Sequence, residues 1–134
     1  MVAFELDERL ASDSVLATVI GLCQLRVMRD GRWPWVILVP QRNGKRELFE
    51  LTPLDQAMLT FETNMVAAAL KEIADAKKIN VGALGNIVSQ LHVHIVARFE
   101  GDPNWPGPIW GFGQAQPRSD ADMQAFINRL TKAL

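Results

Sequence analysis

The stretch SQLHVHIVAR, residues 89–98, contains both histidines of this 134-residue chain. In a β-strand, alternate side chains lie on opposite faces of the sheet. One face of this stretch is wholly apolar and is expected to lie on the core; it comprises Leu91, Val93, Ile95, Ala97 and Phe99. The other face brings two imidazoles together with an amide and a guanidinium, and comprises Gln90, His92, His94, Val96 and Arg98. We expect this second face to carry the chemistry of the protein.

Length and composition predict one ordinary globular domain. The 134 residues are 49% hydrophobic and 22% charged, with a net charge of −1, so residues 1–134 are expected to form a single domain around one core. This near-neutral balance offers no basic surface for a nucleic-acid duplex or an anionic membrane. The single cysteine, Cys23, and the lack of a signal-peptide pattern at the N-terminus suit a cytoplasmic protein.

Four strands are expected from the pattern of the chain. Residues 23–28 alternate in polarity, residues 35–39 are continuously apolar, and the Asp30-Gly31 turn between them predicts a hairpin. Residues 80–84 form a third short strand, and the histidine stretch forms the fourth. The later residues 101–113 are rich in proline and glycine, which predicts an irregular loop.

One long helix is predicted to begin at Thr52. Thr52 can cap it, Pro53 suits its first position, and Asp55 stands three residues after the cap. Lys77 and Lys78 are expected to close it. We expect the face toward the core to consist of Leu54, Met58, Phe61, Met65, Ala69 and Ile73.

Two further helices complete the prediction. A short helix is expected over residues 6–14 with Asp7 as its N-cap, and a C-terminal helix after Ser119. Its apolar face comprises Met123, Phe126, Ile127, Leu130 and Leu134. The expected fold class is therefore α+β, an antiparallel sheet with one long helix and a C-terminal helix.

Three interpretations of the histidine face differ in what they require. A merely solvent-exposed face would not gather both histidines beside Gln90 and Arg98. A metal site needs a third ligand, and Glu100 lies about 20 Å beyond His94 along an extended strand; we therefore expect no metal ligands. A neutral imidazole, in contrast, is a nucleophile near pH 7. His92 would then attack phosphorus, while His94 and Arg98 hold the charged oxygens.

Residues 90–96 resemble the histidine-triad (HIT) motif, in which histidines alternate with apolar residues, but Gln90 stands in the first position. The segment LVPQRN, residues 38–43, is similar to a second HIT landmark, a strand ending in proline and a basic residue. The Thr52-Pro53 helix start and the Gly85-Asn86 turn follow in the order of the family. The similarity extends over roughly residues 20–112 and is greatest to a bacterial HIT-like hydrolase branch with glutamine in the first position.

The resemblance implies an enzyme that cleaves nucleotide conjugates at the α-phosphate. Dinucleoside polyphosphates and nucleoside phosphoramidates are substrates of this type. The resemblance makes His92 the nucleophile of a nucleotidyl-histidine intermediate and lets His94 hold the phosphate and leaving group. It implies ribose binding by Asp30 and phosphate contacts from Asn86. It requires no cofactor, although Mg²⁺ can accompany the substrate, and it implies a two-fold homodimer.

Departures from the family pattern concern the same site. Gln90 and Asn43 replace two histidines, and we expect their amides to hydrogen-bond to each other and to tune catalysis without transferring a proton. The neighbouring Arg42 is expected to contact substrate. Trp105 and Trp110, in the irregular loop, are expected at the dimer interface or against the base, near the partner's active site. The alternative function is a nucleotide-binding module that has lost turnover.

Overall fold

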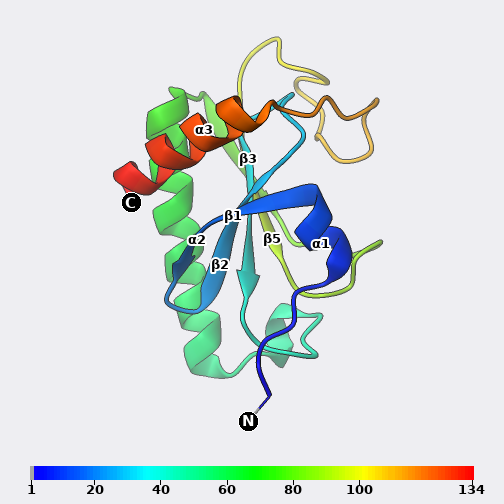
Figure 1. Cartoon of the computed structure of the whole chain (residues 1–134), viewed down its shortest axis with the longest axis vertical. Coiled ribbons are helices and arrows are strands. Elements are labelled where there is room, and N and C mark those ends of the chain that lie inside the picture. Colours follow the sequence, from blue (N-terminus) through cyan, green and yellow to red (C-terminus); the bar gives the residue numbers. More distant parts are fainter. Residues whose placement is uncertain (1) are drawn as a thin grey trace.

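The computed structural model describes residues 2–134 as a five-stranded antiparallel sheet with three α-helices (Figure 1). In chain order the elements are α1 (Glu8–Asp13), β1 (Ser14–Ile20), β2 (Cys23–Met28), β3 (Trp35–Pro40), the 3₁₀ turn η1 (Leu48–Glu50), α2 (Pro53–Ala74), β4 (Lys78–Gly82), β5 (Val93–Arg98) and α3 (Asp120–Ala133). The strand order is β1-β2-β3-β5-β4, so the histidine strand β5 is interior. The predicted α+β fold with a long helix and a C-terminal helix is confirmed.

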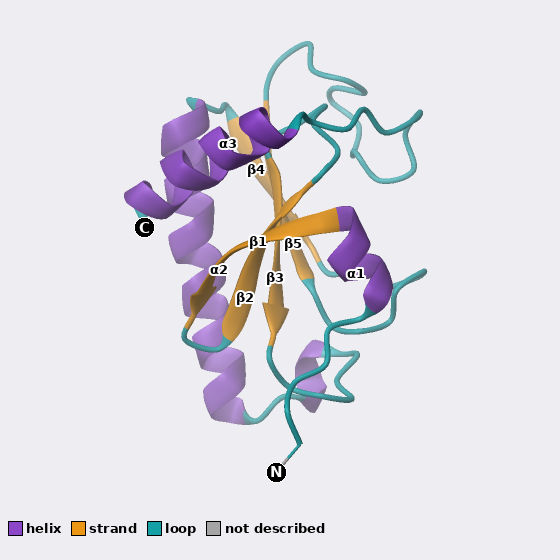
Figure 2. Cartoon of the chain, viewed as in Figure 1, coloured by secondary structure: helices purple, strands orange, loops and turns teal. Residues whose placement is uncertain are grey.

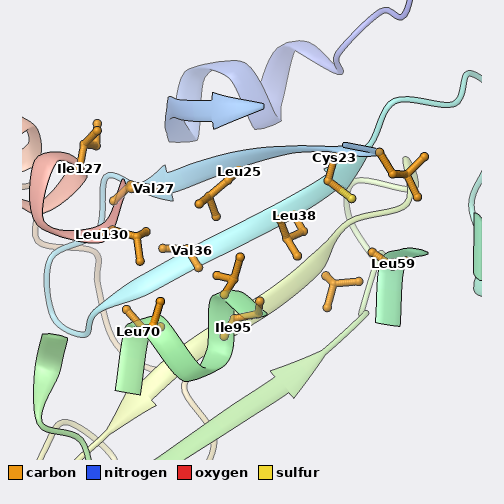
Figure 3. Close-up of a cluster of buried hydrophobic side chains, with 14 of the residues drawn as sticks. Cys23, Leu25, Val27, Val36, Leu38, Leu59, Leu70, Ile95, Ile127 and Leu130 are labelled. Atoms are coloured by element: carbon orange, nitrogen blue, oxygen red, sulfur yellow. The ribbon is translucent and has the colours of Figure 1, made fainter. Parts of the chain in front are cut away.

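The sheet is covered on both faces (Figure 2). α2 and α3 lie on one face, where the main core includes the apolar side of β5 that the sequence predicted. Figure 3 shows Leu59 and Leu70 of α2, and Ile127 and Leu130 of α3, gathered around strand residues such as Leu38. α1 and the long loop before α3 cover the opposite face. The histidines therefore lie on the face away from the two long helices.

Strand β1 is the element that the sequence reasoning did not predict. Its register against β2 shifts between Leu16 and Thr18, a β-bulge that breaks the two-residue alternation on which strand prediction depends. It is also an edge strand, with Leu16 and Val19 exposed, so its apolar residues do not follow the core pattern. The hairpin of β2 and β3 formed as expected.

The long helix begins as predicted but buries a different face. Thr52 caps it by accepting a hydrogen bond from the N–H of Asp55 at 3.1 Å, and Pro53 is its first residue. The predicted core stripe is wrong in its N-terminal half, because Leu54 and Phe61 are 72% and 66% exposed, and right at Ala69, which is buried. The buried residues of α2 are Asp55, Leu59, Glu62, Val66, Ala69 and Leu70.

The reason for this difference is a buried acid. The Glu62 carboxylate accepts hydrogen bonds from the N–H groups of Leu22 and Cys23, at 3.0 and 3.1 Å, and so turns the polar-looking side of α2 toward the β1–β2 turn. The helix ends at Ala74, with Asp75 in a left-handed conformation, before the predicted lysines. No helix within residues 2–134 is long and apolar enough to cross a membrane.

Candidate functional site

Both histidines line one cavity of about 450 Å³ on the face of the sheet opposite α2. Its walls come from the end of α1, from β2 and β3, from the loop over residues 84–88, and from Trp110 in the long loop. His92 and His94 are only 6% and 7% exposed. The interpretation of a merely solvated histidine face is therefore wrong.

His92 is held in one tautomer by the backbone. Its Nδ1 lies 2.6 Å from the carbonyl oxygen of Gln90, which can only accept a hydrogen bond. Nδ1 therefore carries the proton, and Nε2 carries the lone pair. Nε2 has no protein partner among the described residues, so it is the nucleophilic atom available in the cavity.

His94 has the opposite tautomer. The indole N–H of Trp35 donates to its Nδ1 at 3.0 Å, so in the neutral ring Nε2 carries the hydrogen. Burial, and secondarily the neighbouring His92, lowers the pKa of His94 to about 3. The two imidazole rings lie 4.9 Å apart between centroids, nearly edge to face. When both rings are neutral, the pair thus offers one lone pair, on His92, and one N–H donor, on His94.

We expect the depressed pKa of His94 to make the fold less stable in weak acid. In the unfolded chain this histidine titrates near pH 6.5, whereas in the folded state it stays neutral down to about pH 3. The contribution of this pKa shift to the free energy of unfolding is therefore complete above pH 6.5 and is lost as the pH falls. The expected loss between pH 7 and pH 5 is about 2 kcal/mol in the free energy of unfolding.

Urea unfolding at both pH values measures this loss, and His94→Asn is the matched variant. The variant should remove most of the difference between pH 7 and pH 5, whatever its absolute stability. An equal pH dependence in the wild type and in His94→Asn would contradict the assignment.

The cavity has hydrogen-bond donors but no cationic side chain in its lining. Within residues 2–134, the backbone N–H groups of residues 85–90 donate to no other protein group. The N–H of Trp110 is buried without a partner, and its ring lies 5.5 Å from that of His94. Such groups can stabilise an oxyanion without a formal positive charge.

Asn86 is the predicted substrate-binding residue that the structure brings to the histidines. It is exposed and lines their cavity in the loop that begins with Gly85, whose φ of +69° favours glycine. The loop thus presents both an amide side chain and free backbone N–H groups near His92 and His94.

Gln90 and Asn43 do not hydrogen-bond to each other, and that prediction is wrong. The Gln90 side chain points to the N-terminal segment, where it accepts from the N–H of Asp7 and donates to the carbonyl of Glu5. Asn43 binds the same segment at Ala3 and Glu5. What holds His92 is the main-chain carbonyl of Gln90.

Arg98 lies away from the histidines, which corrects its expected role. Its guanidinium is 1% exposed and makes two 2.8 Å hydrogen bonds to Asp102. It also donates to the Asn80 side chain and to the carbonyl of Gly107. Four residues along an extended strand separate it from His94 by about 13 Å. The ion pair closes the loop that follows β5.

The remaining predicted residues are also engaged elsewhere. Arg42 pairs with Asp55 at the start of α2, at 2.8 Å, and Trp105 lies over the Arg98 guanidinium at 5.5 Å.

Asp30 is likewise outside the lining of the cavity. It pairs with Arg32 at 2.8 Å and accepts from the N–H of Gln116. Burial raises the pKa of Asp30, but the hydrogen bonds from Arg32 and Gln116 outweigh it and keep that pKa below its ordinary value. The expected ribose contact is therefore not supported by its position.

Two cavity residues were missed as site residues. Trp35 orients His94, and Asp13 lines the cavity with a carboxylate that has no partner in the described part of the chain, while Trp110 forms a wall. Trp35 is in register with Val96, which puts it diagonally across from His94 on the same face. Strand register supplies this information, and the sequence alone does not.

The metal interpretation has no third ligand in the structure. Both histidines already use Nδ1 in hydrogen bonds within the protein. Across residues 2–134, no group of three or more His, Cys, Asp or Glu side chains is arranged to hold a metal ion.

The family model described as the HIT domain matches residues 11–101 of the chain. This chain belongs to the HIT domain family. A histidine triad protein from Sinorhizobium meliloti is 62% identical, with a TM-score of 0.97 over 98% of this chain and 97% of that one. One from Bradyrhizobium japonicum is 40% identical, with a TM-score of 0.96 over 98% of each chain. The HIT resemblance drawn from the sequence is therefore confirmed.

A more distant relative carries the name of an enzyme. AP-4-A phosphorylase from Mycobacterium tuberculosis is 34% identical over 82 residues, which cover 57% of this chain. The same alignment covers only 42% of that relative. The HIT domain described here is thus similar to part of a longer protein.

Proposed function

We propose that this HIT domain is a nucleotide hydrolase or nucleotidyltransferase that cleaves its substrate at the α-phosphate through a nucleotidyl-His92 intermediate. The observation that carries the proposal is the tautomer of His92. Its Nδ1–H is bound to the Gln90 carbonyl, and its Nε2 lone pair is free in a cavity lined with hydrogen-bond donors. The proposal also assigns the chain to a bacterial HIT-like branch with glutamine in the first triad position.

The reaction has two steps with the same nucleophilic centre. Nε2 of His92 forms a bond to the α-phosphorus as the bond from phosphorus to the leaving group breaks. The leaving group keeps that electron pair and takes up a proton from solvent, while the Nε2–H of neutral His94 donates a hydrogen bond to the departing atom and keeps its own proton. Water, which loses a proton to solvent, or phosphate then attacks phosphorus; the N–P bond breaks, its electron pair returns to Nε2 of His92, and the nucleotide is released.

The charge on phosphorus is held by dipoles in this proposal. The lining of the cavity includes residues 85–88, whose backbone N–H groups are free, the Asn86 amide, and Trp110, whose buried N–H has no partner. Because His94 is neutral at pH 7, it too donates a hydrogen bond. Arg98, which was expected to hold this charge, is paired with Asp102 instead.

The substrate class follows from the similarity to AP-4-A phosphorylase. That relative's name places a dinucleoside polyphosphate first in a panel of candidate substrates. Nucleoside phosphoramidates come next, because their leaving group is an amine that needs a proton. Mg²⁺ can accompany the polyphosphate substrates, bound to their phosphate oxygens.

A panel of adenylated and guanylated compounds tests the proposal. With water as the acceptor, the wild type should release a nucleoside monophosphate from at least one class of compound in the panel. With phosphate as the acceptor, it should release a nucleoside diphosphate. If a nucleotide binds and no product forms under any condition, the chain is a nucleotide-binding module and the proposed activity is wrong.

We also propose a homodimer that joins the free edge of β4 and the exposed side of α2. Leu48, Phe49 and Val81 are exposed near a groove between these elements, and α2 adds Phe61. Light scattering at micromolar concentration should give twice the chain mass, and Val81→Lys should shift it toward the monomer. A monomeric wild type would contradict the dimer.

A further inference from the structure

Two carboxamides hold the N-terminal segment as a neighbouring strand would. Asn43 donates to the carbonyl of Ala3 and accepts from the N–H of Glu5, both at 2.9 Å. Gln90 donates to the carbonyl of Glu5 and accepts from the N–H of Asp7, both at 2.8 Å. Each amide therefore uses its donor and its acceptor on residues two apart, the spacing of a parallel β-ladder. We call residues 3–7 the strap.

The strap is fixed on its apolar side as well. Phe4 and Leu6, the residues between the hydrogen-bonded ones, pack against a small core that includes Leu10, Ile37 and Val39. A carboxamide suits this position because it offers a donor and an acceptor side by side on one planar group. An imidazole at position 90 could not make both hydrogen bonds, because its two nitrogens point in diverging directions.

The strap is connected to the walls of the histidine cavity. Asp7 caps α1 by accepting from the N–H of Arg9 at 2.8 Å, and α1 supplies Leu10 and Asp13 to the cavity wall. The Arg9 guanidinium donates to the carbonyl of Ile87 at 3.1 Å, within the loop that forms the opposite wall. The position of the strap therefore determines the position of α1, and through Arg9 that of the 84–88 loop.

Gln90 joins the strap to the nucleophile. Its side chain holds Glu5 and Asp7, while its main-chain carbonyl accepts the hydrogen bond from Nδ1 of His92. We propose that the strap, held by Asn43 and Gln90, sets the shape of the histidine cavity and the orientation of His92. Gln90 and Asn43 are positioning residues and do not touch the reacting atoms. The predicted effect of the strap on nucleotide binding rests on the proposed function. Its predicted effect on the shape of the cavity does not.

Asn43→Leu and Gln90→Leu test this inference, with Gln124→Leu as the control. Gln124 is a surface carboxamide on α3 whose amide donates to the Asn128 side chain. Hydrogen exchange at Glu5 and Asp7 should be faster by at least about tenfold in both strap variants, since each loses two hydrogen bonds. The control should exchange at the rate of the wild type.

Carbethoxylation of His92 by diethyl pyrocarbonate, followed by mass spectrometry, measures how accessible the nucleophile is without any nucleotide. The rate should rise severalfold in Asn43→Leu, whose side chain binds the strap and is not part of the cavity lining. With a nucleotide substrate, the KM of Asn43→Leu should be about tenfold higher than that of the wild type, and the pH profile of its kcat should be unchanged.

Two results would overturn the inference. One is unchanged exchange at Glu5 and Asp7, which would show that the amides do not hold the strap. The other is faster exchange with an unchanged rate of His92 modification, which would show that the strap does not shape the cavity. If Gln90→Leu fails to fold, Asn43→Leu decides the question. Absence of nucleotide turnover in the wild type would refute the proposed function and leave both measurements valid.

Discussion

His92→Ala is expected to lower nucleotide turnover by at least about 10⁴-fold, because the variant lacks the atom that forms the covalent bond to phosphorus. His92 and His94 are the only histidines in the chain, and Nδ1 of His94 already accepts from Trp35. No second imidazole in the chain can therefore take the place of His92. Nucleotide binding should change little, since the donors of the 85–90 loop remain.

The matched variant is His94→Asn, which removes the neighbouring ring and keeps the nucleophile. Its turnover should fall by a smaller factor of about 10²–10³, the range for the loss of one hydrogen-bond donor to the charge that develops on the leaving group. Leaving groups that need no proton, such as pyrophosphoryl groups, should be less affected than amines. Equal losses in the two variants on every substrate would argue against separate roles for the two histidines.

Arg98→Ala is expected to destabilise the fold by about 3–5 kcal/mol, the cost of leaving one member of a buried ion pair without its partner. The side chain of Arg98 is 1% exposed and that of Asp102 is 7% exposed. The variant also deprives the Asn80 side chain and the carbonyl of Gly107 of a donor. Urea unfolding at pH 7 measures the loss.

The double variant Arg98→Met with Asp102→Leu is the control for this prediction. It removes both charges, so it should be markedly more stable than Arg98→Ala. In Arg98→Ala the folded protein should keep the KM of the wild type, because this pair lies away from the histidines. A large rise in KM with little loss of stability would return Arg98 to the substrate-binding role first expected of it.

Local signals predicted most of the fold. The Thr52 cap, the Ser119 cap and the alternation along residues 23–28 each act within a few residues, and each element formed where they indicated. The buried face of α2 was not predictable in this way, because it depends on Glu62 reaching backbone N–H groups 40 residues earlier in the chain. Strand β1 was missed because its bulge breaks the alternation.

The sequence predicted the site residues that lie close together in the chain. It did not predict which polar side chains are already paired with residues outside the motif. His92, His94 and Asn86 lie within nine residues of one another, and they share the cavity. Arg98 and Asp30 carry the right chemistry for the substrate, but Asp102 and Arg32 neutralise them. Gln90 was singled out from the motif, but its hydrogen-bond partner is the strap, more than 80 residues away in sequence.

The mass of the acid-quenched protein tests the central claim most directly. Wild type mixed with a dinucleoside polyphosphate or a phosphoramidate, and quenched during turnover, should carry one added nucleoside monophosphate. Peptide mapping should place it on His92, and the adduct should be absent from His92→Ala. Product formation with no adduct in the wild type, or with an undiminished rate in His92→Ala, would contradict the account.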